Sequence, residues 1–305
     1  MELSARYRGC LLGLAIGDAV GTALEFQAPG TFQPLTDMVG GGPFRLKPGQ
    51  WTDDTSMAMC LAESLLECGG FDPVDQLRRY VRWWREGYWS STGRCFDIGN
   101  TTSASLREFE RTGRPWCGST EARSAGNGSI MRLAPIALYY GGSRDVAVAR
   151  AADSSRTTHG ARAAVDGARY LAALLVGLLE GRSKSELVDP DAVGTWRGEE
   201  ALTPEIDEIR RGSYLRRGPP EIRGGGYVVE TLEAALWAFH STGSFRDGCL
   251  RVVNLGEDAD TTGAVFGQLA GAYYGEDELP AAWRARLHLH DRIVQMADDL
   301  LRCRA

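Results

Sequence analysis

The sequence of 305 residues lacks the cysteine patterns that hold small secreted proteins or thiolate zinc sites together. Its seven cysteines are an odd number, and no two of them form a C-x-x-C pair. Such a set argues against a disulfide framework and against a zinc site built from thiolates. We therefore expect a protein of the reducing cytoplasm.

Long apolar runs and an excess of basic charge are also missing. No run approaches the ~20 apolar residues that a membrane-spanning helix needs, and the most apolar early stretch, residues 10–24, carries Asp18 in its middle. We predict that this stretch is a core helix and that no segment spans a membrane. Lys and Arg number 34 against 40 Asp and Glu, giving a net charge of -6. Because the basic residues are scattered, nucleic acid is not an expected partner.

Strand signals are sparse, because alternating runs rich in Val, Ile and Thr are hard to find and no β-α-β rhythm is present. Apolar residues recur instead at helical spacing, in segments 56–69, 74–89, 161–181, 228–243, 264–275 and 286–303. Three long polar loops, 27–51, 111–129 and 213–226, lack the character of interdomain linkers. We predict an all-α protein in one domain, residues 1–305, with a site built from its loops.

Two acidic segments, "TDDT" at 52–55 and "DADTT" at 258–262, each stand at the start of an apolar helix. Helix capping accounts for one acid or hydroxyl per helix, whereas these segments carry two acids each, with threonines beside them. Magnesium and manganese prefer carboxylate and hydroxyl oxygens, and a pair of such ions needs several acids. Neither segment contains His or Cys. Coincidental caps and a metal site are the two explanations that the residues allow.

Two further segments contain candidate functional residues. Gly126, Asn127, Gly128 and Ser129 precede an apolar helix, and this combination suits a phosphate or pyrophosphate, although Gly and Asn are also ordinary turn residues. Asp97, in "FDIGNTT", comes just before a glycine and a helix cap. It is either an exposed catalytic acid or base, or a turn former.

Together these segments resemble a known family. In order and spacing they are similar to the ADP-ribosylglycohydrolases, from about residue 6 to residue 275, with the nearest likeness to the branch of the dinitrogenase reductase-activating glycohydrolase, which removes ADP-ribose from arginine. The segments that carry the resemblance are "GCLLGLAIGDAVGTALEF", "KPGQWTDDTSM", "FDIGNTT", "AGNGSIMR", "TTHG", "GGYVVETLEAAL" and "NLGEDADTTGAVFGQLAGAYYG".

The resemblance implies a compact, orthogonal bundle of helices with two divalent cations, Mg2+ or Mn2+, at the bottom of an ADP-ribose cleft. It implies that Asp97 acts near the scissile bond and that Glu25 lies on a mobile loop beside the metals. The residues that match the family's metal ligands are Thr52, Asp53, Asp54, Asp258, Asp260 and Thr261.

The resemblance also implies the substrate contacts. Asn100, Gly126, Asn127, Gly128 and Ser129 would hold the phosphates and the distal ribose, His159 would contact the ribose or a phosphate, and Tyr227 would stack on adenine. From the residues alone, His159 and Tyr227 could equally be structural, and Trp51 could line the rim of the cleft or belong to the core. Glu257, which stands where the family pattern has glycine, could lie behind the ligands or face solvent.

The function that the resemblance implies is hydrolysis of the N-glycosidic bond between ADP-ribose and arginine. The expected partners are an ADP-ribosylated protein as substrate and ADP-ribose as product, with the chain acting as a monomer. Three alternatives remain: a hydrolase of serine-linked ADP-ribose, a hydrolase of O-acetyl-ADP-ribose, and a silent ADP-ribose binder.

Overall fold

The computed structural model describes residues 1–194 and 201–305, and helices dominate both ranges. Within these ranges the chain forms no strand, and the isolated bridges pair residue 41 with 46, 119 with 159, and 126 with 227. The all-α prediction is therefore confirmed for the described residues. The α-helices are α1 (Leu3–Gly21), α2 (Asp53–Cys68), α3 (Pro73–Glu86), α4 (Asn100–Thr112), α5 (Ala134–Tyr139), α6 (Arg144–Arg156), α7 (Arg162–Leu179), α8 (Lys184–Leu187), α9 (Pro204–Arg210), α10 (Val228–Ser241), α11 (Phe245–Val253), α12 (Ala259–Tyr274), α13 (Ala281–Arg286) and α14 (His290–Arg302).

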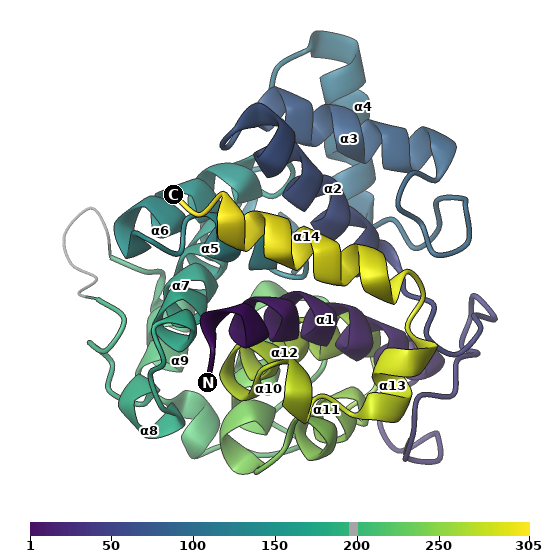
Figure 1. Ribbon diagram of the computed structural model, residues 1–305, viewed down its shortest axis with the longest axis vertical. Helices are drawn as coiled ribbons and strands as arrows, with labels where there is room; N and C mark the ends of the chain where they lie inside the picture. Colours follow the sequence, from purple (N-terminus) through teal and green to yellow (C-terminus); the bar gives the residue numbers. More distant parts are fainter. Residues whose placement is uncertain (195–200) are drawn as a thin grey trace.

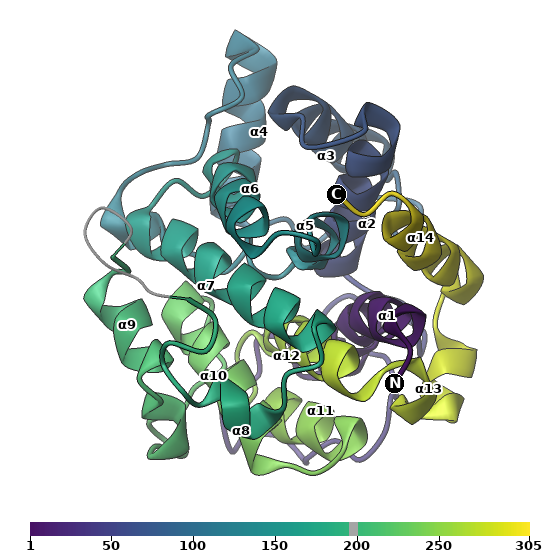
Figure 2. The same ribbon diagram turned by 60° about the vertical axis from the view of Figure 1, so that its left-hand side comes forward.

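Helices α1 and α12 lie side by side in the middle of the protein (Figures 1 and 2). Helix α14 packs against α1, while α10 and α11 pack against α12. Because α1 is apolar on nearly every side, it is stable only when other helices surround it, and its residues 9–21 are all buried. This central pair carries the site described below.

A row of small residues brings α1 and α12 unusually close together. Glycines four positions apart lie on one face of a helix, and a Cβ atom on any of the four in α1 would lie between 2.0 and 2.3 Å from a backbone oxygen of α12. Only residues without a side chain allow this approach. From one end of the antiparallel pair to the other, the facing residues are Gly9 with Gly271, Gly13 with Gly267, Gly17 with Gly263, and Gly21 with Ala259.

The outer helices begin and end with recognisable signals. In α3, the side chain of Asp72 accepts hydrogen bonds from the backbone of Val74 at 2.8 Å and Asp75 at 3.0 Å, and Gly87 ends the helix in the left-handed conformation. Such caps provide hydrogen-bond partners for the backbone N–H and C=O groups that have none within the helix at its two ends. Helix α14 begins at His290, later than the predicted start at 286, because α13 ends there and Leu289 has a left-handed φ of 52°.

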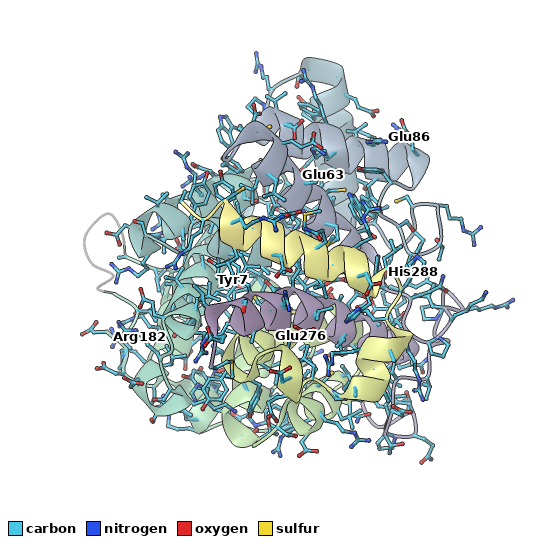
Figure 3. All side chains as sticks on the ribbon, in the orientation of Figure 1. Tyr7, Glu63, Glu86, Arg182, Glu276 and His288 are labelled. Atoms are coloured by element: carbon cyan, nitrogen blue, oxygen red, sulfur yellow. The ribbon has the colours of Figure 1, made fainter. Side chains whose placement is uncertain are left out.

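Figure 3 shows the side chains on this frame. Glu86 and Arg182 lie at the outer edge of the view, whereas Tyr7 is fully buried and donates a hydrogen bond to the carbonyl of Leu138 at 2.8 Å. Among the described residues, no helix is both long enough and apolar enough to cross a membrane.

Candidate active site

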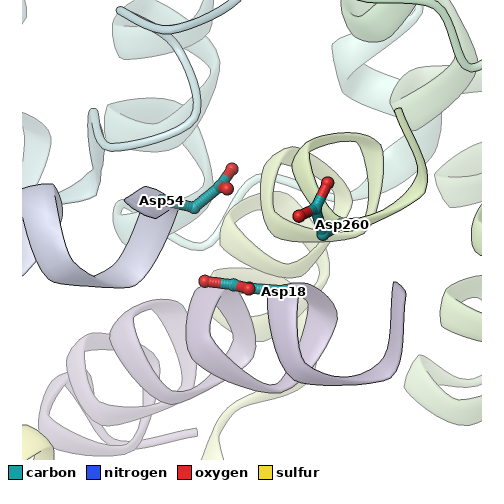
Figure 4. A group of neighbouring side chains, drawn as sticks. All are labelled: Asp18, Asp54 and Asp260. Atoms are coloured by element: carbon teal, nitrogen blue, oxygen red, sulfur yellow. The ribbon is translucent and has the colours of Figure 1, made fainter. Parts of the chain in front are cut away.

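The two acidic segments predicted to meet do come together. Asp54, in the first turn of α2, and Asp260, in the first turn of α12, lie beside Asp18 of α1 (Figure 4). One carboxylate oxygen from each of the three lies within 4.8 Å of the other two. All three side chains are buried. Segments about two hundred residues apart in the sequence therefore form one cluster of acids, and that cluster is able to hold a metal ion.

Asp18 was not among the predicted site residues, yet it organises the start of α2. Its Oδ1 accepts hydrogen bonds from the backbone N–H of Thr52 at 2.8 Å and from the hydroxyl of Thr52 at 2.9 Å. Its Oδ2 accepts from the backbone of Thr55 at 3.0 Å and from the Thr55 hydroxyl at 2.6 Å. The carboxylate of Asp18, which belongs to another helix, thus accepts hydrogen bonds from backbone N–H groups at the start of α2 that have no partner within that helix.

Glu25 takes the corresponding position at the start of α12. Its Oε2 accepts a hydrogen bond from the backbone N–H of Ala259 at 3.1 Å. Two further bonds fix the same loop, since Phe26 N–H donates to the Glu257 carbonyl and Glu257 N–H donates to the Gln27 carbonyl, both at 2.7 Å. The carboxylate of Glu25 is therefore held directly against the acidic segment of α12.

The cap explanation for the acidic segments does not match these contacts. Thr52 and Asp258 occupy the N-cap positions of α2 and α12, and neither side chain makes a capping hydrogen bond. Asp18 and Glu25 supply those bonds instead. One oxygen of Asp54 accepts from the Thr52 hydroxyl at 3.0 Å and one of Asp260 accepts from the Thr261 N–H at 2.8 Å, and the repulsion among these acids needs another source of compensation.

A second group of acids shares Asp260 with the first. Oxygens of Glu25, Asp97 and Asp260 lie within 4.8 Å of one another. Asp97 has a left-handed φ of 60°, a conformation that costs energy for a residue other than glycine. Burial, and then the neighbouring carboxylate of Asp260, raise the pKa of Asp97 and of Glu25 above the usual range.

Asp18 and three acids of the two acidic segments show the same electrostatic signature. Burial is the main cause that raises the pKa of Asp53, Asp54 and Asp258, and nearby carboxylates add to it. Burial also raises the pKa of Asp18 to about 7, with Asp260 as the second cause. Buried like charges make one another costly to ionise, so this cluster is stabilised either by protons or by a cation.

The donor set fits a hard divalent cation. Oδ1 of Asp54 and Oδ2 of Asp260 are buried and have no hydrogen-bond partner among the described residues. Buried polar atoms are seldom left in that state without a ligand. The atoms around them are oxygens of carboxylates and hydroxyls, which Mg2+ and Mn2+ prefer. The Thr261 hydroxyl, 3.5 Å from Asp54 Oδ2, belongs to the same surroundings.

The predicted phosphate loop is attached to the acidic segment of α12. The side-chain amide of Asn127 donates to Asp258 Oδ2 and to the Thr231 hydroxyl, each at 2.9 Å. Both of its N–H groups are therefore used within the protein. Gly126 pairs with Tyr227 in an isolated bridge, so the loop, the start of α10 and the acids lie next to one another.

The remaining predicted substrate contacts are placed as follows. Tyr227 is 39% exposed at the N-cap of α10, which leaves its ring available to a ligand. Asn100, the first residue of α4, is exposed. Ser129 is buried, and its hydroxyl has no hydrogen-bond partner among the described residues. The ring of His159 is buried beside Gly128, where a Cβ atom would lie 2.7 Å from Cε1 of the histidine.

The structure resolves the alternative for Trp51 and shows the partner of Glu257. Trp51 belongs to the core, because it is fully buried and its Nε1 donates to the Trp89 carbonyl at 3.3 Å. The Glu257 side chain forms an ion pair with Arg223 from the glycine-rich loop before α10. Of the residues in the acid cluster, sequence reasoning missed Asp18, although a lone acid inside an apolar run is a signal of a buried, partnered carboxylate.

Comparisons with known proteins agree with this arrangement. The ADP-ribosylglycohydrolase family model matches residues 1–305. The chain is 43% identical over 293 residues to the ADP-ribosylarginine hydrolase Tri1 of Serratia proteamaculans, covering 96% of this chain and 78% of that protein. It is 32% identical over 302 residues to the ADP-ribosyl-dinitrogen reductase glycohydrolase of Rhodospirillum rubrum, covering 97% and 95%. A solved structure described as an ADP-ribosylglycohydrolase-related protein complex matches with a TM-score of 0.87 and 43% identity, covering 100% of this chain and 99% of the other.

Proposed function

Because this chain belongs to the ADP-ribosylglycohydrolase family, we propose that it removes ADP-ribose from arginine side chains of modified proteins. It is a glycosyl hydrolase, and the bond broken joins C1 of the terminal ribose to a guanidinium nitrogen. The observation that carries the proposal is the shared position of Asp260, which joins one group of acids suited to a cation and a second group that holds Glu25 and Asp97.

Two divalent cations, Mg2+ or Mn2+, would be held by Asp53, Asp54, Asp258 and Asp260 with the hydroxyls of Thr52 and Thr261. The unpartnered oxygens of Asp54 and Asp260 support this assignment. When bound, such cations supply positive charge that offsets the acids and attracts the hydroxyls of the terminal ribose. Asp18 would position the cation ligands at the start of α2 without binding a cation itself, because its oxygens already accept four hydrogen bonds from Thr52 and Thr55.

Asp97 and Glu25 would serve the bond-breaking step. Positive charge develops at C1 of the ribose as the bond to the guanidinium breaks, as in other glycoside cleavage, and a nearby carboxylate stabilises it. We assign to Asp97 the task of orienting the attacking water and taking its proton. One oxygen of Glu25 is engaged with Ala259 N–H, so Glu25 is the better candidate for holding the loop and the ribose in place.

The adenosine end of the ligand would lie along the loop that contains Gly126, Gly128 and Ser129. Tyr227, which is exposed at the start of α10, would stack on adenine, a contact worth about 1 to 3 kcal/mol by analogy with bases on aromatic side chains. Both side-chain N–H groups of Asn127 donate within the protein. We therefore assign Asn127 a role other than ligand binding, which is to connect the phosphate loop to Asp258. We place Asn100 at the outer end of the binding region because its side chain is exposed.

The test is release of free ADP-ribose from a protein modified on arginine, with and without a chelator, beside matched substrates modified on serine and O-acetyl-ADP-ribose. Rapid, cation-dependent release from arginine alone supports the proposal. Preference for the serine linkage or the acetyl ester would assign a different bond. Tight ADP-ribose binding without turnover of any substrate would identify a silent binder.

A further inference from the structure

A fully buried arginine, Arg132, lies behind the predicted phosphate loop. Its partners among the described residues are the Met57 sulfur at 3.7 Å from Nη1, the ring of Tyr80 at 4.6 Å from the guanidinium carbon, and one hydroxyl. That hydroxyl belongs to Thr158, whose Oγ1 is 2.6 Å from Nη2 of Arg132. Within the described part of the chain, the only oxygen that accepts a hydrogen bond from this buried cation is therefore the hydroxyl of Thr158, directly before His159.

The same Thr158 oxygen lies 2.9 Å from Nδ1 of His159. Arginine has donors and no acceptor, so Thr158 Oγ1 must accept from Arg132. The threonine then has its own hydrogen to donate, and Nδ1 of His159 is within reach. If Nδ1 carried a proton instead, the buried Thr158 hydrogen would have no acceptor among the described residues. Buried donors are rarely left unpaired, so Nδ1 is the acceptor and Nε2 carries the proton.

The charge state follows from the same contacts. A doubly protonated His159 would also donate from Nδ1, so the Thr158 hydroxyl would accept from both Arg132 and His159, and its own buried hydrogen would have no acceptor among the described residues. Burial, and then the guanidinium of Arg132, lower the pKa of His159 to about 3. The imidazole is therefore neutral, with its single N–H on the edge that faces away from Thr158.

That edge faces the loop of glycines. A Cβ atom on Gly128 would lie 3.0 Å from Nε2 of His159, and one on Gly126 would lie 3.5 Å from it. His159 is only 3% exposed, but neither glycine has a side chain and no described residue hydrogen-bonds Nε2, so this N–H lacks a partner within the described residues and would be satisfied by a ligand that runs along the loop. An oxygen of a phosphate or of a ribose is an acceptor of the right kind.

We propose that Arg132 and Thr158 hold His159 as a neutral donor, so that its Nε2–H hydrogen-bonds an oxygen of ADP-ribose bound along residues 126–128. The identity of this ligand rests on the proposed function. Arg132 and Thr158 are positioning residues, because they act through the histidine without touching the ligand. A neutral donor binds an acceptor oxygen in the same way at every pH at which the protein is folded, whereas a titrating imidazole would not.

The test uses nitrogen NMR of the full-length, 15N-labelled protein without ligand. The chain has only four histidines, His159, His240, His288 and His290, so a His159→Gln variant assigns the signals of His159 by their loss. We expect the chemical shifts of a neutral ring protonated at Nε2. A neutral ring protonated at Nδ1, or a doubly protonated ring, would overturn the proposal without bearing on hydrolysis of the arginine linkage.

Addition of ADP-ribose and two variants complete the test. In the native protein, ADP-ribose should shift the Nε2 and Hε2 signals, and absence of a shift at saturation would also overturn the proposal. Thr158→Val removes the hydroxyl and keeps the shape, so it should mix the two neutral forms and weaken ADP-ribose binding about tenfold. Thr158→Ser restores the hydroxyl and should restore the Nε2–H form. Unchanged spectra and affinity in Thr158→Val would contradict the role of Thr158, and if that variant fails to fold, the native spectrum still decides.

Discussion

Replacing Gly17 with alanine should separate α1 from α12 next to the acid cluster. The new Cβ would lie 2.0 Å from the Gly263 carbonyl oxygen, about 1.4 Å short of the 3.4 Å at which ordinary contact begins. Alanine gains up to about 1 kcal/mol of helix propensity over glycine, while overpacking a rigid interior costs about 1 to 3 kcal/mol. The clashing atom is a backbone oxygen, which cannot move aside by a change of rotamer as a side chain can. We therefore expect net destabilisation.

The effect on the site should exceed the effect on stability. Asp18 follows Gly17 directly, and a shift of about 1 Å is several times the ~0.2 Å tolerance of metal–ligand distances. We expect the Gly17→Ala variant to bind Mn2+ about 10 to 100 times more weakly, a loss comparable to that from disturbed groups behind metal ligands. Titration calorimetry with Mn2+ measures this directly in the folded variant.

Gly9→Ala is the matched control. Its Cβ would lie 2.3 Å from the Gly271 oxygen, a similar clash, but nine residues, or about 13 Å along α1, from Asp18. Thermal unfolding should show comparable losses for the two variants, and calorimetry should show weak cation binding only for Gly17→Ala. Equal Mn2+ affinity in both variants and in the native protein would refute the view that the glycine contact sets the geometry of the acids.

Three further predictions concern the acids themselves. Asp97→Asn should keep ADP-ribose binding and lower the rate of release from arginine about 10² to 10⁴ times, measured under single-turnover conditions; a native rate would remove Asp97 from the chemistry. Asp258→Ala should weaken cation binding and loosen Asn127, which donates to Asp258 Oδ2 at 2.9 Å; unaltered affinity in calorimetry would exclude Asp258 as a ligand. The third prediction concerns the protein from which a chelator has removed the cations. Burial raises the pKa of Asp18 and of Asp258 from 3.8 to about 7. Between about pH 4 and 7 the folded protein therefore binds more protons than the unfolded chain, and its stability falls as pH rises. Thermal unfolding at pH 5 and pH 8 tests this, and a higher melting temperature at pH 8 than at pH 5 would contradict it.

The meeting of α2 and α12 could be predicted from the sequence because each segment carries more acids than a helix start needs. The crowding of Asp53 with Asp54, and of Asp258 with Asp260, is a local property of the sequence, and a metal site is one of the two explanations that it allows. The helical class could be predicted for the same reason, since apolar spacing along each segment is also local.

The role of Asp18 depends on tertiary contacts that cannot be inferred from the spacing of residues in the sequence. Its four hydrogen bonds reach Thr52 and Thr55, more than thirty residues away in the sequence. The same holds for Glu25 at the start of α12 and for Asn127 at Asp258. Each of these contacts joins segments that lie far apart in the sequence and side by side in the folded protein, so spacing along the sequence does not predict it.

The start of α14 shows a different limit. Apolar spacing continues through residues 286–303, and this continuity predicts one helix. The structure instead ends α13 at Arg286 and begins α14 at His290, with His288 packed against Trp51 at 5.4 Å between ring centres. A tertiary contact therefore interrupts a pattern that is locally consistent with a helix.

The most direct test of the central claim is the rate of ADP-ribose release from an arginine-modified protein as Mn2+ is titrated into chelator-treated enzyme, with Asp260→Asn measured in parallel. Since Asp260 belongs to both groups of acids, we predict that release by the native enzyme starts near zero and rises to saturation with Mn2+, and that the variant stays inactive at cation concentrations that saturate the native enzyme. Full activity in chelator, or native activity in Asp260→Asn, would contradict the claim that these acids form one cation-dependent catalytic site.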